Sequence, residues 1–521
     1  MTIYKSTKKI HIPTDQNLTE LLHTTARPDN KLRQQAQTTS SDNKLGQHVV
    51  FEDDLEGRTI TLEQLRQKAG RLAYALNAHY KPVDQSRWAV ILPNSATIAE
   101  VVHTILWLGG VFCPINHQLL SSEIAHALVV SRPAYIITYG KVIQKIEDAI
   151  IIARKTNPGY KPEIITAIHH DINFQHCSLE KDFPASNQLL VPHYADTRDR
   201  LASIHLSSGT TGLPKGVGLS QYNYLSNVYQ LWNHDPERWN TEESVLSVTP
   251  FVHLANGTVP FFLGPWTGVR HIIMSSYEVE KLGKLVEERR PTTVQMLPTI
   301  LQGVLRSQLT TRYDFSSVKR ITGSHGGLKR DEEEQLFGRG KWQPLQMYGL
   351  TEAGPWVAVQ RVSEHLKKGQ MGQLVPGLEG RLITETGADA KNGTSGELWI
   401  RGPNVTKGYI DNPEANRNAF PAEGWFNTGD ICAISEDGIV SLVGRTKELI
   451  KYNSFQVSPN ELEVYLLQHP AVSDGAVGPT WDKAKDTEVP TAYVVLNKTF
   501  TAEVSTIQVL QDIQTKVDNQ F

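Results

Sequence analysis

Apolar residues in the first half of the chain recur with the spacing of alternating helices and strands. From Thr61 onward, leucine and alanine return at intervals of three and four residues, which predicts an amphipathic helix. Residues 88–92 then predict a buried strand, and a second helix begins near Ala96. Strand-like runs return at residues 134–137 and 293–296. This alternation predicts parallel or mixed sheets covered by helices.

The pattern changes after about residue 370, where short strands and tight turns replace the alternation. Residues 396–402 and 438–444 each begin and end in glycine, which predicts two short strands. A capping-box sequence at residues 458–461, with proline at the first helical position, predicts that a helix begins there. A second α+β pattern therefore starts near residue 445.

We expect three segments. Residues 1–50 are polar and weakly patterned and predict an N-terminal arm packed on the surface. Residues 51–445 predict a large α/β domain, with mixed parallel sheets flanked by helices and a β-rich subdomain. Residues 446–521 predict a small α+β domain.

Composition narrows the possible partners. The 521 residues are 39% hydrophobic and 21% charged, with a net charge of −3, so no basic footprint for nucleic acid is present. The three cysteines, Cys113, Cys177 and Cys432, are far apart, which argues against a disulfide framework or a zinc site. No apolar stretch has the length of a membrane span, and the first residues lack a signal-peptide core. These features predict a cytoplasmic protein without a membrane span.

The strongest chemical signal is the run at residues 206–217. Its candidate anion-binding residues are Ser207, Ser208, Gly209, Thr210, Thr211, Gly212 and Lys215. Glycines let backbone N–H groups approach a ligand, and the hydroxyls and the lysine add donors, so the run suits a polyphosphate. It is not a Walker A loop, because Lys215 is followed by Gly216 rather than by serine or threonine. A flexible surface loop is the alternative interpretation.

Two further motifs have chemistry that fits a nucleotide. In residues 348–354, Tyr348 can stack on a base, Thr351 can bond a phosphate and Glu352 can hold Mg²⁺. Asp430 can accept ribose hydroxyls, and Arg445 follows it in the next strand-like run. Each motif alone could be an ordinary turn or a surface charge.

The three motifs, in this order, resemble those of the adenylate-forming superfamily of acyl-CoA synthetases, adenylation domains and beetle luciferases. The resemblance extends from about residue 60 to about residue 495 and is closest to acid–CoA ligases of the 4-coumarate–CoA ligase type. It implies a two-step reaction in which a carboxylic acid and ATP give acyl-AMP, and CoA then accepts the acyl group. It also implies a requirement for Mg²⁺ and a mobile C-terminal domain.

The resemblance assigns roles to individual residues. Residues 207–216, with Lys215, would surround the outer phosphates, Thr351 would contact the α-phosphate, and Glu352 would hold the metal. The nucleoside would be bound by Ser324, His325, Gly326, Tyr348, Asp430 and Arg445. His253 would separate the acid pocket from the CoA path. Lys447 would be the hinge, and Lys451 and Gln456 would serve the thioester step.

The acid pocket departs from the pattern of the coumarate enzymes. Met347, before the tyrosine, replaces a glycine, and Trp356 replaces a small aliphatic residue, with Gly349 between them along the chain. We expect these side chains to shorten the pocket, so that an aliphatic or small aryl acid is favoured over a hydroxycinnamate.

The C-terminus departs as well. The family ends in a lysine-bearing segment that follows the position of Val495, and the sequence contains no such segment. We therefore expect an incomplete C-terminal domain and slow formation of acyl-AMP. A peroxisomal targeting signal would also lie in a missing segment.

Two alternative functions remain open at this point. An adenylation domain that loads a carrier protein is one, although an aspartate typical of amino-acid selection is absent from residues 251–256. The other is a homologue impaired in adenylation that binds an acyl-adenylate or a nucleotide.

Overall fold

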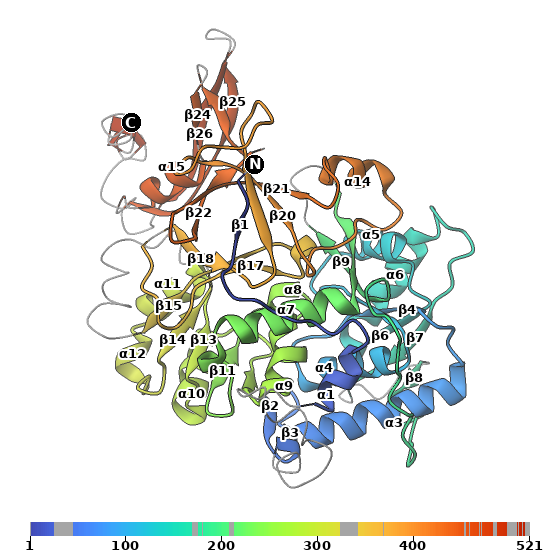
Figure 1. The fold of residues 1–521 in the computed structure, drawn as a ribbon. Coiled ribbons are helices and arrows are strands. Elements are labelled where there is room, and N and C mark those ends of the chain that lie inside the picture. The colour runs from blue at the N-terminus through green and yellow to red at the C-terminus, as the bar shows by residue number, and fades with distance from the viewer. Residues whose placement is uncertain are drawn as a thin grey trace.

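The computed structural model describes residues 2–24, 45–168, 176–179, 181–207, 213–323, 342–367, 369–446, 448–452, 455–457, 459–467, 469, 471–482, 487–496, 508, 510–512 and 514–515. Within these residues the strands form two seven-stranded sheets, an eight-stranded sheet and two hairpins. The C-terminal segment lies at one end, beyond the eight-stranded sheet, and the helix-covered sheets lie at the other (Figure 1).

The first seven-stranded sheet has the order β10-β9-β5-β4-β6-β7-β8 and is parallel apart from the β9–β10 pair. Its strands are β4 (Arg87–Val90), β5 (Val111–Pro114), β6 (Tyr135–Thr138), β7 (Glu163–Thr166), β8 (Cys177–Ser178), β9 (Leu201–Ser207) and β10 (Lys215–Ser220). The helices that alternate with them are α3 (Leu62–Tyr80), α4 (Ala96–Trp107), α5 (Ser121–Ser131) and α6 (Ile143–Ala153). Helix α3 begins at the predicted position, because the Thr61 hydroxyl accepts the Gln64 amide at 3.2 Å.

The second seven-stranded sheet has the order β15-β14-β13-β11-β12-β2-β3 and is parallel apart from the β2–β3 pair. Its strands are β2 (Val49–Asp53), β3 (Thr59–Thr61), β11 (Ser244–Ser247), β12 (Arg270–Ile273), β13 (Thr293–Gln295), β14 (Arg320–Thr322) and β15 (Gln343–Leu345). Its helices are α10 (Val279–Arg289), α11 (Pro298–Arg306) and α12 (Leu309–Arg312). Parallel strands and crossover helices confirm the expected α/β pattern in this half of the chain.

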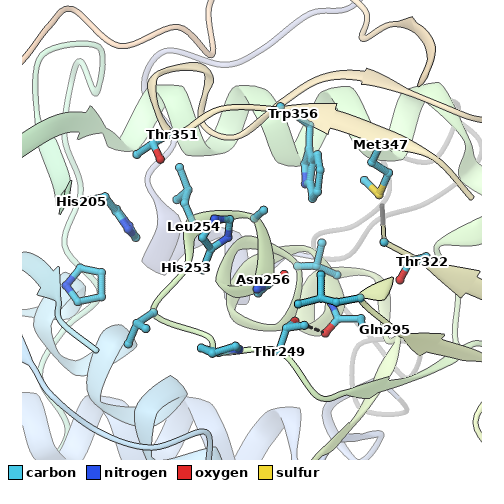
Figure 2. Close-up of a pocket in the computed structure, with 18 of the residues that line it drawn as sticks. His205, Thr249, His253, Leu254, Asn256, Gln295, Thr322, Met347, Thr351 and Trp356 are labelled. Atoms are coloured by element: carbon cyan, nitrogen blue, oxygen red, sulfur yellow. Dashed lines mark hydrogen bonds between the residues drawn. The ribbon is translucent and has the colours of Figure 1, made fainter. Parts of the chain in front are cut away.

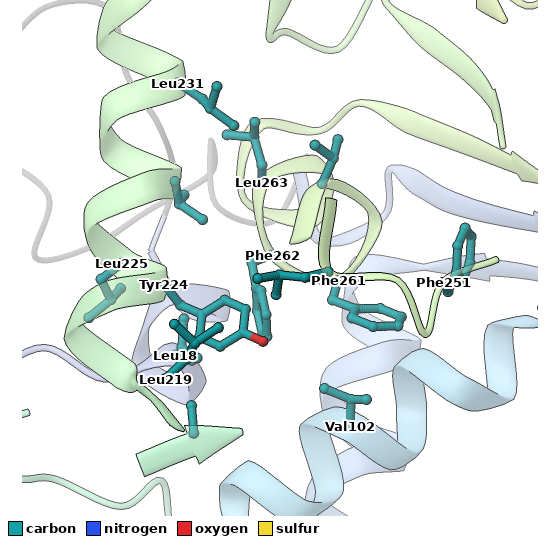
Figure 3. Packing of buried hydrophobic residues seen from close by; sticks show 14 of the residues in the cluster. Leu18, Val102, Leu219, Tyr224, Leu225, Leu231, Phe251, Phe261, Phe262 and Leu263 are labelled. Atoms are coloured by element: carbon teal, nitrogen blue, oxygen red, sulfur yellow. The ribbon is translucent and has the colours of Figure 1, made fainter. Parts of the chain in front are cut away.

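The core lies where α4 and α7 (Gln221–His234) run between the two sheets (Figure 1). Every residue of α4 is buried, and Glu100 on this helix is paired with Arg58 at 3.0 Å. Near α7, the Tyr224 ring packs edge-to-face against Phe262, and Phe261 and Phe251 continue the aromatic cluster (Figure 3). Three short helical segments complete this region: α8 (Leu254–Thr258), the π-helix Val259–Leu263 and α9 (Gly264–Thr267).

The eight-stranded sheet is antiparallel and has the order β1-β19-β20-β21-β22-β18-β17-β16. Its strands are β1 (Tyr4–Lys5), β16 (Met347–Gly349), β17 (Trp356–Val359), β18 (Gln370–Leu374), β19 (Glu379–Ile383), β20 (Gly396–Arg401), β21 (Phe426–Ile434) and β22 (Ile439–Arg445). Helix α14 (Pro413–Ala419) follows β20. The change of pattern near residue 370 therefore corresponds to this β-rich sheet.

The C-terminal segment contains two hairpins and a helix. Strands β23 (Ile450–Tyr452) and β24 (Phe455–Val457) pair with each other, as do β25 (Val472–Asp482) and β26 (Thr487–Leu496). Helix α15 (Pro459–Leu466) begins at the predicted proline. That this domain is incomplete stays a prediction.

The N-terminal arm is more deeply packed than expected for a surface segment. Helix α1 (Leu18–Leu22) buries Leu18, Leu21 and Leu22 in the main core, against α4, α7 and α9. A five-residue helix is too short to show a hydrophobic period, so no pattern in the sequence predicts it. No helix in the described part of the chain has the length and apolarity needed to cross a membrane.

Candidate active site

The candidate phosphate-binding run begins and ends on adjacent antiparallel strands. Ser207 ends β9, Lys215 begins β10, and the two residues are paired in register. The Ser207 hydroxyl is buried and has no hydrogen-bond partner in the described residues. Residues 208–212, which include Ser208, Gly209, Thr210, Thr211 and Gly212, lie outside the described residues.

Tyr409 joins this run to the second motif. The ammonium of Lys215 lies 5.1 Å from the centre of the Tyr409 ring, and the Tyr409 hydroxyl donates to Glu352 Oε1 at 2.9 Å. Burial and the neighbouring carboxylate raise the pKa of Tyr409, so its hydroxyl stays protonated and donates. Glu352 is itself buried, and the two motifs that lie 137 residues apart in the chain therefore meet at one aromatic ring.

The segment that carries Tyr409 is held across the site by backbone hydrogen bonds. The Thr406 amide donates to the Glu352 carbonyl at 2.8 Å, and the Ile410 amide donates to the Gly216 carbonyl at 2.8 Å. No sequence pattern points to Tyr409, because these contacts are tertiary and leave no local signal.

Tyr348, Asp430 and Arg445 form the third group. The Tyr348 hydroxyl donates to Asp430 Oδ2 at 2.5 Å, and Arg445 Nε lies 3.2 Å from Asp430 Oδ1. Asp430 and Arg445 are register partners on β21 and β22, which fixes their separation. Burial raises the pKa of Asp430, whereas the hydrogen bond from Tyr348 and the charge of Arg445 oppose that rise. Two residues from different strands thus orient one buried carboxyl.

A cavity of about 590 Å³ opens beside the second motif. Its wall includes five of the predicted site residues: His253, Met347, Gly349, Thr351 and Trp356. Figure 2 shows Thr351 and His205 at one side of this cavity, Met347 and Thr322 at the opposite side, and Trp356 between them.

Two histidines on the cavity wall are held neutral. Burial lowers the pKa of His253, and burial lowers the pKa of His205 to about 3, with a smaller effect of His253. The His205 ring also hydrogen-bonds the Tyr224 hydroxyl at 2.8 Å, which fixes its orientation. The cavity wall therefore presents neutral imidazoles near pH 7.

Several predicted residues cannot be placed by side chain. Ser324, His325, Gly326 and Lys447 lie outside the described residues. Lys451 and Gln456 are register partners on the β23–β24 hairpin, and only their backbone is described.

Comparison with known proteins decides the family. A family model described as AMP-binding enzyme matches residues 33–410. The chain belongs to this family of enzymes. Among curated relatives, 4-coumarate–CoA ligase 1 of Petroselinum crispum is 30% identical over 469 residues, which cover 88% of this chain and 84% of the relative. Peroxisomal OPC-8:0-CoA ligase 1 of Arabidopsis thaliana is 31% identical over 459 residues, covering 86% of this chain and 81% of the relative.

Solved structures show the same fold. ATP-bound MatB from Rhodopseudomonas palustris aligns with a TM-score of 0.77 at 23% identity, covering 96% of this chain and 92% of MatB. The o-succinylbenzoate CoA synthetase of Bacillus subtilis, solved with its acyl-adenylate intermediate, aligns with a TM-score of 0.76 at 23% identity, covering 97% of this chain and 92% of that protein. The predicted family and the predicted fold class are confirmed.

Proposed function

We propose that this protein is an ATP-dependent acid–CoA ligase, which activates a carboxylic acid as acyl-AMP and transfers the acyl group to CoA. One observation carries the proposal. Thr351 lines the cavity, and its neighbour Glu352 is joined through Tyr409 to Lys215. A pocket of sufficient size for a small acid therefore adjoins a group of residues suited to phosphate and metal.

The residues around Glu352 fit a magnesium ion held together with a nucleotide. The Tyr409 hydroxyl donates a hydrogen bond to Glu352 Oε1, and no described residue donates one to Oε2. No cluster of three or more metal-binding side chains occurs among the residues that the structure describes. Mg²⁺ commonly binds through one or two carboxylates and substrate phosphates, so Glu352 would hold it, and the ion would neutralise phosphate charge.

The first step needs positioning more than proton transfer. A carboxylic acid is already ionised near pH 7, so its oxygen can attack the α-phosphorus of ATP and displace pyrophosphate without a general base. Lys215 and the residue 207–216 run would stabilise the departing phosphates, and Thr351 would contact the α-phosphate. Tyr348, Asp430 and Arg445 would bind the nucleoside.

The second step is attack of the CoA thiol on the acyl carbon, with release of AMP. We assign His253 to the boundary between the acid pocket and the CoA path, because it is neutral and lies on the cavity wall. Lys451 and Gln456 would be presented after rotation about Lys447. CoA is preferred over a carrier protein as acceptor, since the curated relatives cited above are named CoA ligases.

The size of the acid is set by two large side chains. Met347 and Trp356 both line the cavity. We expect hexanoate to be activated faster than coumarate, because the flat ring system needs the space these side chains fill. Equal turnover of the two acids in a CoA-release assay would contradict this limit on size.

The test is ATP–pyrophosphate exchange with a panel of acids, followed by thioester formation with CoA. Exchange that depends on both the acid and Mg²⁺, with a thioester identified by mass, is the expected result. A protein that binds ATP in calorimetry yet exchanges no pyrophosphate with any acid would instead be a nucleotide-binding homologue.

A further inference from the structure

Arg238 is a buried arginine on the wall of the cavity that is proposed to hold the acid. It ends the short 3₁₀ turn Pro236–Arg238 that follows α7, and it is 7% exposed. Both Nη atoms lie 3.8 Å from Met347 Sδ, and the guanidinium carbon lies 4.5 Å from the centre of the Trp239 ring. A thioether sulfur and an indole ring are weak partners for a full positive charge.

No acidic side chain in the described residues forms an ion pair with Arg238. Its neighbour Asp235 accepts the Val362 amide at 2.8 Å, and Glu243 is paired with Arg320 at 2.7 Å. Burial lowers the pKa of Arg238 to about 10, with Asp235 opposing that change, so the guanidinium is still charged near pH 7. A buried charge with no carboxylate in contact is costly, and an anion that enters the cavity would reduce that cost.

The position of Arg238 places this charge away from the reacting end of the acid. Met347, which Arg238 contacts, lies across the cavity from Thr351 and His205 (Figure 2). The proposed function puts the reacting carboxylate beside Thr351. The far end of the acyl chain then extends toward Met347 and Arg238.

We propose that the acid is a dicarboxylic acid, and that Arg238 selects it by pairing with the carboxylate that does not react. This inference rests on the proposed ligase function. A guanidinium binds a carboxylate through two parallel N–H donors, which gives both strength and orientation. A monocarboxylic acid of the same length would place a methyl group against the charge and leave it unpaired.

The test compares matched acids. Dicarboxylic acids of four to eight carbons are assayed beside their monomethyl esters and the monocarboxylic acids of equal carbon number, by kcat/KM for thioester formation. We expect the best diacid to exceed its monomethyl ester by about 10- to 100-fold, the range for a charge-assisted hydrogen bond. In Arg238→Met this preference is lost, mainly through KM for the diacid, while Arg238→Lys retains part of it.

Controls separate selection from stability. Arg312→Met removes an exposed arginine that pairs with Glu280, and it should keep the preference of the unmodified protein. Melting temperature and ATP affinity are measured for each variant. If Arg238→Met does not fold, the substrate ratio of the unmodified protein decides the inference alone.

The possible failures are distinct. Activation of monocarboxylic acids as fast as diacids, or an unchanged preference in Arg238→Met, would overturn the inference and leave the ligase function standing. No turnover with any acid would contradict the ligase function, and the inference with it.

Discussion

The two walls of the proposed site differ in how their polar side chains are partnered. The nucleotide wall is the proposed phosphate, metal and nucleoside group of Lys215, Tyr348, Glu352, Tyr409, Asp430 and Arg445. The acyl wall is the part of the cavity wall that carries Arg238, Met347 and Trp356. On the nucleotide wall, Glu352 accepts a hydrogen bond from Tyr409, and Asp430 is held by Tyr348 and Arg445. On the acyl wall, Arg238 has no paired carboxylate in the described residues, and the Trp356 indole N–H is buried with no hydrogen-bond partner there. Glu352 and Asp430 are thus oriented by side chains of the protein itself, although Ser207 nearby has a buried hydroxyl without a partner among the residues that the structure describes. Arg238 and Trp356 instead leave charged or polar groups for a ligand to satisfy.

This difference matches the two kinds of substrate. ATP is common to the whole family, so its wall can be fixed in advance by contacts within the protein, which reduces reorganisation during the reaction. The acid differs between relatives, and specificity is gained where the site penalises an acid that leaves a buried group unpaired. Substitutions on the two walls should therefore affect different kinetic constants.

The largest effect is expected on the nucleotide wall, from Glu352→Gln. The amide oxygen can still accept the Tyr409 hydroxyl, so the substitution removes charge while it keeps shape. We expect the rate of ATP–pyrophosphate exchange to fall about 10²- to 10³-fold, as for loss of one strong electrostatic group in a transition state. In a magnesium titration, the Mg²⁺ concentration for half-maximal exchange should rise.

Glu436→Gln, at an exposed turn, is the matched control and should leave exchange unchanged. A fall of less than about threefold in Glu352→Gln would remove Glu352 from the metal site, since charge-assisted contacts are worth more than this.

A smaller effect, confined to one substrate, is expected from Asp430→Asn. The change keeps an oxygen for Tyr348 and removes the counter-charge of Arg445. We expect KM for ATP to rise about tenfold or more, with KM for the acid nearly constant. Arg238→Met should show the opposite pattern, with a raised KM for the acid and a nearly constant KM for ATP. Equal effects of Asp430→Asn on both KM values would show that the walls are not independent.

Three buried histidines, His103, His205 and His271, make the stability of the protein depend on pH. Burial lowers the pKa of His103 to about 4, and that of His205 and His271 to about 3. Below pH 6.5 the unfolded chain binds protons that these folded-state imidazoles do not, so unfolding becomes easier as the pH falls toward their pKa values. Each histidine should cost about 1.4 kcal/mol per pH unit in this range.

Urea unfolding at pH 7.5 and pH 5.5 measures this loss. His271→Asn should unfold more easily at pH 7.5 and lose less stability on acidification than the unmodified protein. An unchanged pH dependence in this variant would mean that His271 already binds a proton in the folded state near pH 5.5.

The residues proposed to bind the nucleotide can be found in the sequence, whereas Arg238 cannot, for a physical reason. Tyr348, Thr351 and Glu352 lie within five residues of one another, in a segment that contains Gly349 and Gly354. Such a segment can be recognised without a structure. The proposed role of Arg238 depends on a tertiary contact, in which the turn after α7 meets Met347 of β16. That contact joins residues 109 positions apart, so it leaves no local pattern in the sequence.

The same limit applies within each region. The helix–strand alternation was correct because hydrophobic periodicity is local, as α3 and α4 show. Helix α1 was missed because its five residues are shorter than the window in which a period is visible. Tyr409 was missed because Glu352 and Lys215, which it contacts, are far from it in the chain.

The smallest effect on the rate of exchange is expected from substitution of Tyr409, an uncharged residue of the nucleotide wall. Tyr409→Phe removes the hydrogen bond to Glu352 and keeps the ring beside Lys215. A neutral donor contributes about 0.5–1.5 kcal/mol, so exchange should slow about 2- to 10-fold. Tyr409→Leu also removes the ring and should slow exchange further. If Tyr409→Phe slowed the reaction as much as Glu352→Gln, Tyr409 would act on the substrate directly rather than through the orientation of Glu352.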